Sequence, residues 1–94
     1  MALVKNVEKR IFDIEGFEVT IRDANGRALK KNAQLRMYRN YERQAQNNWK
    51  VSEWKEQRFS PNYPGLEVDV LDGQGHVARG NTTLWRLRDS YSED

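Results

Sequence analysis

Two neighbouring groups of side chains in this 94-residue chain have the chemistry of a binding surface. Between positions 33 and 48, Arg36, Arg39 and Arg43 recur at spacings of three and four residues. A helix would place these side chains on one stripe, and guanidinium groups bind phosphates. Two tryptophans interleaved with cationic residues follow, and such rings stack on bases or hold peptide side chains. The candidate binding surface comprises Arg36, Arg39, Arg43, Trp49, Lys50, Trp54 and Arg58.

Both groups also have a purely structural interpretation. Leu35 and Tyr38 lie on an apolar stripe of the same expected helix, so the arginines would form its solvated outer face. A chain this short needs its large side chains in the core. Trp49, Trp54 and Phe59 would then fill the space between two halves of the fold. The sequence leaves both interpretations open.

Residues suited to catalysis or cofactor binding are few. His76 is the only histidine, and a lone histidine at a hairpin turn is normally an ordinary surface residue. The absence of cysteine excludes thiol nucleophiles, disulfides and thiolate metal sites. The glycines of segment 72–80 lack the lysine and the helix of a phosphate-binding loop. We therefore expect a non-enzymatic protein with no catalytic residue, no cofactor and no metal.

One stretch of the sequence occurs twice and sets the expected architecture. Residues 16–39 and 65–88 match at an offset of 49. The identical pairs are Gly16/Gly65, Glu18/Glu67, Val19/Val68, Asp23/Asp72, Gly26/Gly75, Asn32/Asn81, Leu35/Leu84 and Arg39/Arg88. Two hairpins can also look alike by chance, so the duplication is a hypothesis that the arrangement of the elements must support.

Each copy opens with a period of two, which predicts a strand with one buried face. The apolar positions of these strands are Phe17, Val19, Ile21, Leu66, Val68 and Val70. A turn follows each strand, and its last residue, Gly26 or Gly75, can take a positive φ without steric cost. Short return strands are expected at 27–31 and 76–80.

A helix is expected after each hairpin. The first would cover about 33–48, and the second would end near residue 91. Asparagine accepts hydrogen bonds from the free N–H groups of a first helical turn, so Asn32 and Asn81 are the expected N-caps, with Thr82 as an alternative in the second copy.

The fold class that follows is α+β: a small single domain over 1–94 in which antiparallel β-hairpins pack against helices. The pattern is a ββα–ββα repeat, with repeat-like halves 16–48 and 65–91 joined by 49–64. A further strand at Lys9–Ile14 would extend the sheet.

Composition narrows the function only slightly. Charged residues of both signs make up 32% of the chain, and the net charge is only +2, which favours no class of partner strongly. No apolar run is long enough to cross a membrane, and we expect no membrane association and a cytoplasmic location.

Two functions agree with these observations. The first is a protein–protein interaction or regulatory accessory module, whose partner is another protein or a second copy joined at a sheet edge. The alternative is a nucleic-acid-binding protein that uses the arginine-rich helix face with the adjacent tryptophans. The near balance of charge favours the first.

Overall fold

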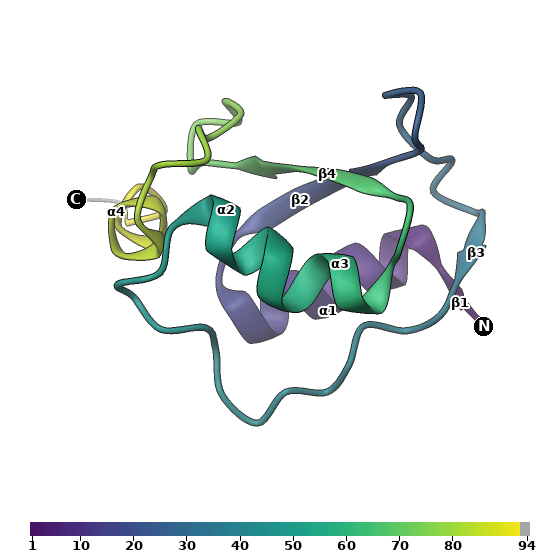
Figure 1. Cartoon of the computed structure of the whole chain (residues 1–94), viewed down its shortest axis with the longest axis horizontal. Helices are drawn as coiled ribbons and strands as arrows, with labels where there is room; N and C mark the ends of the chain where they lie inside the picture. The colour runs from purple at the N-terminus through teal and green to yellow at the C-terminus, as the bar shows by residue number, and fades with distance from the viewer. Residues whose placement is uncertain (93–94) are drawn as a thin grey trace.

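The computed structural model of the protein, which describes residues 1–92, has an α+β fold (Figure 1). The elements in chain order are β1 (Ala2–Leu3), α1 (Val4–Glu15), β2 (Glu18–Arg22), β3 (Gln34–Leu35), α2 (Val51–Trp54), η1 (Lys55–Phe59), α3 (Ser60–Asn62), β4 (Glu67–Leu71) and α4 (Leu84–Asp89). Strand β1 pairs antiparallel with β3, and β2 pairs antiparallel with β4. The predicted fold class is confirmed.

Strands β2 and β4 form where the period of two predicts them. Val19 lies opposite Val70 and Ile21 opposite Val68, and all four side chains are buried against the helices beneath the sheet. On the other face Arg22 donates to Asp69 at 2.6 Å across the two strands. The alternation therefore sets both the buried face and the register, because a one-residue slip would expose every valine.

The two predicted turns are also present. Asp23 Oδ1 accepts from the N–H groups of Asn25 and Arg27 at 2.9 and 3.0 Å, and Asp72 repeats this pattern. Donation from the N–H groups of His76 and Gln74 lowers the pKa of Asp72. Each predicted return strand is reduced to a single bridge, Arg22 with Ala28 and Leu71 with Val77.

Helix α1 replaces the strand expected at Lys9–Ile14. Val4, Val7 and Ile11 are spaced by three and four residues, and all three are fully buried, which is the period of a helix and not of a strand. The helix ends at Gly16, which has a φ of 85° and donates its N–H to Phe12 C=O at 2.9 Å.

The helix expected over 33–48 does not form. After β3 the chain continues without helix through residues 36–49, which we call the strap and which loops below the helices in Figure 1. Side chains of other elements satisfy the backbone groups of the strap: Arg10 donates to Tyr38 C=O at 3.4 Å, and Tyr63 donates to Arg36 C=O at 2.8 Å. These tertiary bonds replace the internal hydrogen bonds of a helix.

The second predicted helix is present as α4, but its N-cap is neither Asn81 nor Thr82. Thr83 Oγ1 accepts from Arg86 N–H at 3.2 Å, and Leu84 and Leu87 fill the core. Thr83 has the extended backbone that an N-cap requires, with φ −72° and ψ 150°.

Each of β2 and β4 is preceded by a helix whose first N–H groups donate to the segment that returns from that strand, and only β4 is also followed by a helix, α4. At the start of α1, Val4 donates to Ala33 C=O and Lys5 to Lys31 C=O, at 2.8 and 3.1 Å. At the start of α2, Val51 donates to Thr82 C=O and Ser52 to Gly80 C=O, at 2.8 and 2.9 Å. The predicted order of elements, ββα, is therefore wrong in the first half, and the duplication itself stays a prediction.

The turn geometry predicts that Gly26→Ala and Gly75→Ala each lower the melting temperature. Both glycines have a φ near +83°, with φ values of 82° and 84°, and a Cβ there meets no heavy atom within 4 Å. The cost is therefore backbone strain, about 1–2 kcal/mol, or roughly 4–8 °C for each kcal/mol in a domain of this size. Thermal unfolding measures it, with Gly80→Ala as the matched control at ordinary φ. Equal melting temperatures for all three variants would contradict the turn assignment.

Candidate functional site

Trp54 lies in the core and not on the predicted surface. Its side chain is 0% exposed, its ring packs edge-on against Phe17 at 5.0 Å, and Nε1 donates to the Tyr38 hydroxyl at 3.2 Å. Phe59 is buried beside it, with the two ring centroids 5.9 Å apart. The structural interpretation therefore holds for Trp54 and Phe59, whereas Trp49 is only half-buried.

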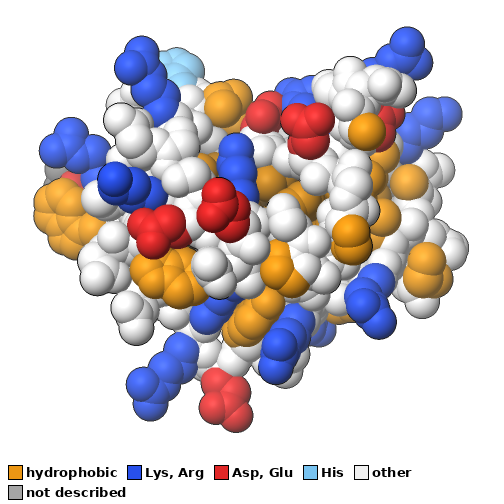
Figure 2. Space-filling view, in the orientation of Figure 1, with side chains coloured by type: hydrophobic (Ala, Val, Ile, Leu, Met, Phe, Trp, Pro, Cys, Tyr) orange, Lys and Arg blue, Asp and Glu red, His pale blue; other side chains and the backbone are white. Residues whose placement is uncertain are grey.

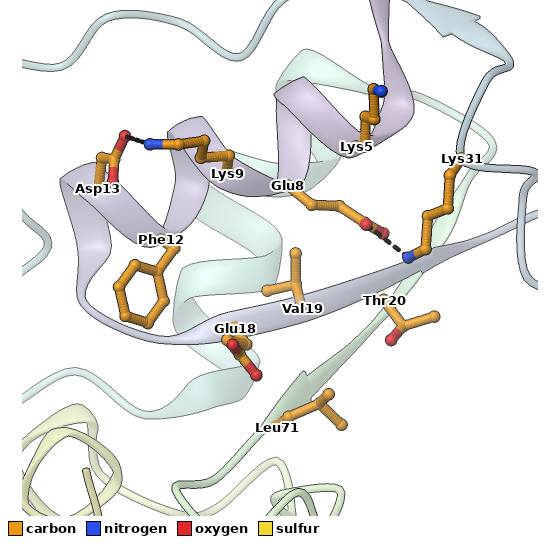
Figure 3. Close-up of a pocket in the computed structure, with 10 residues that line it drawn as sticks. All are labelled: Lys5, Glu8, Lys9, Phe12, Asp13, Glu18, Val19, Thr20, Lys31 and Leu71. Carbon is orange, nitrogen blue, oxygen red and sulfur yellow. Dashed lines mark hydrogen bonds and ion pairs between the residues drawn. The ribbon is translucent and has the colours of Figure 1, made fainter.

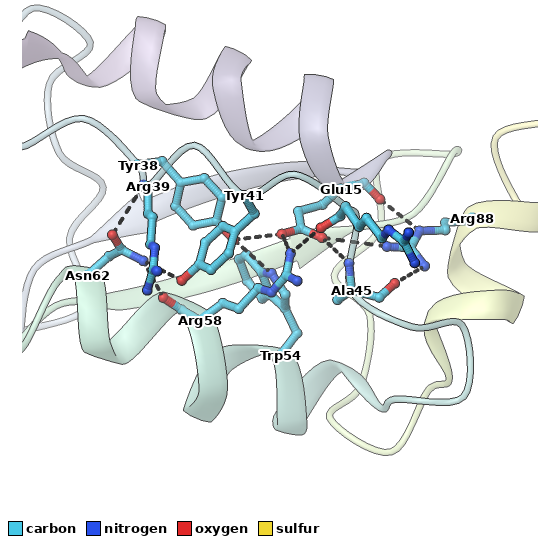
Figure 4. Close-up of polar contacts among 10 residues, drawn as sticks. Glu15, Tyr38, Arg39, Tyr41, Ala45, Trp54, Arg58, Asn62 and Arg88 are labelled. Carbon is cyan, nitrogen blue, oxygen red and sulfur yellow. Dashed lines mark hydrogen bonds and ion pairs between the residues drawn. The ribbon is translucent and has the colours of Figure 1, made fainter.

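Arg58 belongs to a buried polar network centred on Glu15, which we call the Glu15 clasp (Figure 4). The Glu15 carboxylate is 0% exposed and accepts from Tyr38 Oη at 2.7 Å, Ala45 N–H at 2.8 Å and Arg58 Nη1 at 2.7 Å. The second arginine of the clasp, Arg88, lies with Nη2 at 3.6 Å from the carboxylate. The members are Glu15, Tyr38, Ala45, Arg58 and Arg88.

The clasp joins four separate segments of the chain. Arg88 on α4 also donates to Glu15 C=O at 2.7 Å and to Ala45 C=O at 2.8 Å, so it connects α1 to the strap. Burial lowers the pKa of Arg88, and the Glu15 carboxylate opposes this shift. Since α1, the strap, η1 and α4 meet at one carboxylate, the clasp is a structural element that fixes the path of the strap.

The remaining predicted cations stay on the surface. Arg36, Arg39 and Arg43 are exposed on the strap, and none of them forms an ion pair within residues 1–92, nor does Lys50. In Figure 2, Lys and Arg side chains predominate along the lower margin of the molecule, over the strap. The structure therefore divides the predicted surface, placing Trp54 and Arg58 inside and the strap arginines outside.

A groove that the sequence did not indicate lies between α1 and the outer edge of β2 (Figure 3). Its volume is about 560 Å³. Its lining residues are Lys5, Glu8, Lys9, Phe12, Asp13, Glu18, Val19, Thr20, Lys31 and Leu71. The groove is not predicted from the sequence because a strand is expected over Lys9–Ile14. Only a helix places Lys5, Lys9 and Phe12 on the same side.

The outer edge of β2 is partly closed and partly open. Ile21 donates its N–H to Glu8 Oε2 at 3.0 Å, and its C=O accepts from Leu29 N–H at 2.9 Å, so Ile21 faces this edge and is satisfied. Val19, two residues earlier, directs its backbone groups to the same edge because the period of a strand is two. Among the turn, loop and side-chain hydrogen bonds of residues 1–92, none involves the Val19 backbone, and 5% of Val19 is exposed.

The groove is charged at both ends and apolar between them. Lys31 pairs with Glu8 at 2.6 Å at one end, and Lys9 pairs with Asp13 at 3.2 Å at the other. Phe12 lies between β2 and the Lys9–Asp13 pair in Figure 3, and 40% of it is exposed. An exposed phenyl ring beside an open strand edge is suited to hold a peptide side chain.

The described part of the chain has an exposed histidine and no group of clustered metal ligands. No group of three or more histidine or acidic residues within it could hold a metal ion. His76 is exposed in its turn, at the position that the sequence predicts. No helix in the described range is both long and apolar enough for a bilayer crossing.

Comparisons of the chain with models of known protein families, with curated proteins and with solved structures find no match.

The Glu15 clasp predicts a large effect of Glu15→Gln on the free energy of unfolding. The amide keeps the size of the buried side chain but leaves two partly buried arginines, Arg58 and Arg88, without their countercharge, which costs about 3–5 kcal/mol. Urea unfolding followed by tryptophan fluorescence measures it. Lys9→Gln is the control, because it breaks the exposed Lys9–Asp13 pair and should cost less than about 1 kcal/mol. Equal losses in the two variants would contradict the role of the clasp.

Burial also predicts a loss of stability at alkaline pH. It raises the pKa of Tyr63 to about 12, and burial together with Glu15 raises the pKa of Tyr38. Because the folded state holds these protons more tightly than the unfolded state, the stabilisation is complete below pH 10 and falls as pH rises toward 12. In Tyr63→Phe the decline should be shallower, by roughly 2 kcal/mol near pH 12. Urea unfolding over this range tests it, and identical declines would contradict it.

Proposed function

We propose that the protein is a protein-binding module that takes an extended segment of a partner into the groove between α1 and β2. The open strand edge at Val19 carries this proposal. A backbone C=O of the incoming strand would accept a hydrogen bond from the Val19 N–H, and a backbone N–H of that strand would donate one to the Val19 C=O. Complexes formed by strand addition use this pattern. Main-chain hydrogen bonds then supply affinity without requiring a particular sequence at every position.

The side chains around the edge add selectivity. Phe12 is exposed where a partner side chain could lie flat on α1, and aromatic anchors of this kind contribute much of the energy of an interface. Lys5 and Lys31 stand at one end of the groove, and Asp13 and Glu18 at the other (Figure 3). A segment with acidic residues toward Lys5 and basic residues toward Asp13 would bind in one direction only.

The shape of the edge favours a segment of another protein over a second copy of this chain. The edge of β2 is covered from Ile21 onward, because Leu29 N–H donates to Ile21 C=O. The open part of the edge is therefore short and asymmetric. In a two-fold β2–β2 pairing, the return segment of each copy would lie opposite the start of β2 in the other. A short, irregular partner segment avoids this overlap, and the small contact area is that of a transient complex.

Selection from a displayed library of random peptides tests the proposal. The selected peptides should share an apolar residue flanked by charges, and on binding they should slow hydrogen exchange of the Val19 amide. Phe12→Ala should weaken binding by about tenfold. Trp85→Ala is the matched control, because Trp85 is 57% exposed on α4 and does not line the groove.

Two outcomes would contradict the proposal. The first is a set of peptides that bind equally well to the wild type and to Phe12→Ala while the melting temperatures of the two proteins agree. The second is exchange protection that appears on α4 or on the strap and leaves Val19 unchanged. Sedimentation of the free protein adds a further test. If the wild type forms dimers that the Phe12→Ala substitution dissociates, the groove is occupied by a second copy of this chain.

A further inference from the structure

The positive charge of this protein is concentrated on one face. Six arginines lie in the strap or donate to its backbone, and two carboxylates lie with them, an excess of four positive charges. This equals the whole excess of residues 1–92, which hold 16 cationic and 12 acidic side chains. The arginines are Arg10, Arg36, Arg39, Arg43, Arg58 and Arg88, and the carboxylates are Glu15 and Glu42. We call the part formed by Arg10 and residues 36–49 the strap face; it holds four arginines and a single carboxylate, Glu42.

The arginines of the strap face gather at two tyrosines. Tyr63 donates to Arg36 C=O at 2.8 Å; burial raises the pKa of Tyr63, and the positive charges of Arg10 and Arg36 oppose this shift. Further along the strap, the guanidinium of Arg39 lies 5.4 Å from the centroid of the Tyr41 ring, and that of Arg58 lies 4.0 Å from it. Arg36, Arg39 and Arg43 thus form a row along the strap, which we call the track.

The Glu15 clasp holds this track in place. Glu15 accepts from Ala45 N–H, Arg58 donates to Arg43 C=O at 3.0 Å, and Asn62 Oδ1 accepts from Arg39 N–H at 3.2 Å. The strap backbone is therefore fixed by bonds that do not use the guanidinium groups of Arg36, Arg39 or Arg43. Binding an anionic chain would order three side chains and no backbone, which keeps its entropic cost small.

We propose that the strap face binds single-stranded nucleic acid. The cations are all arginines, whose planar forks bind phosphate oxygens in pairs, whereas lysine acts as a point charge. The half-buried rings of Tyr41 and Trp49 belong to the same strap, Tyr41 with the Arg39 guanidinium 5.4 Å from its centroid and Trp49 with that of Arg58 at 5.8 Å. A partly exposed ring can stack on an unpaired base. An acidic peptide would satisfy the charges but would leave these rings without a stacking partner.

This inference is independent of the protein-binding groove. None of the groove residues belongs to the strap face. A negative result in the peptide experiment would not count against nucleic-acid binding by the strap face. A negative result for the strap face would not count against peptide binding in the groove.

Fluorescence anisotropy with labelled oligothymidylate and oligouridylate tests the inference over a range of salt concentrations. With three phosphates contacted, the logarithm of affinity should fall with the logarithm of salt concentration with a slope of about −2. In the triple variant Arg36→Gln, Arg39→Gln, Arg43→Gln, affinity at low salt should fall at least about tenfold and the slope should approach zero.

A second triple variant, Lys30→Gln, Arg79→Gln, Arg86→Gln, is the matched control. It removes the same charge from exposed positions outside the strap, and its affinity should change less than about threefold. Thermal unfolding of both variants verifies the fold. Equal losses in the two variants, no binding of the wild type at low salt, or competition by polyglutamate as strong as by oligonucleotide would each overturn the inference.

Discussion

The rest of this structure depends on one buried carboxylate. Glu15 is fully buried at the end of α1, and hydrogen bonds and ion pairs connect it to the strap, to η1 and to α4. A buried charge is costly unless it is paired and hydrogen-bonded, so each of its partners is held firmly in place. The strap has no secondary structure of its own to resist displacement, and the clasp supplies the constraint that a helix would otherwise have provided.

This constraint explains why the candidate surfaces differ from those that the sequence suggests. Arg58 and Trp54 are directed inward, Arg58 to the Glu15 carboxylate and Trp54 to the Tyr38 hydroxyl. The strap arginines are left outside, because the strap is bonded through its backbone. On the other side of α1, the same helix forms one wall of a groove along the edge of β2. One helix thus separates two surfaces of different chemistry.

The fold was predictable wherever the signal was local. The alternation in 17–22 and 66–71 fixed both strands and their buried faces, and the turns followed from aspartate and glycine at set positions. The prediction of a helix over 33–48 was wrong. The apolar residues do have helical spacing, but the strap backbone is stabilised more by hydrogen bonds to other segments than it would be by those of a helix. The prediction of a strand at 9–14 was wrong because the helical spacing starts earlier, at Val4, and six residues are too few to show it.

The sequence by itself determined the α+β class, the two strands β2 and β4 with their buried faces, the turns and the positions of the cationic residues, because each depends on neighbours along the chain. Only the tertiary structure decided that these two strands pair with each other and which of the cationic residues face solvent. It also decided that Val19 presents an open edge and that Glu15 meets two arginines distant in sequence. The physical reason is that a buried polar group takes its partner from whichever segment lies nearest in space, and spacing along the chain does not encode that distance.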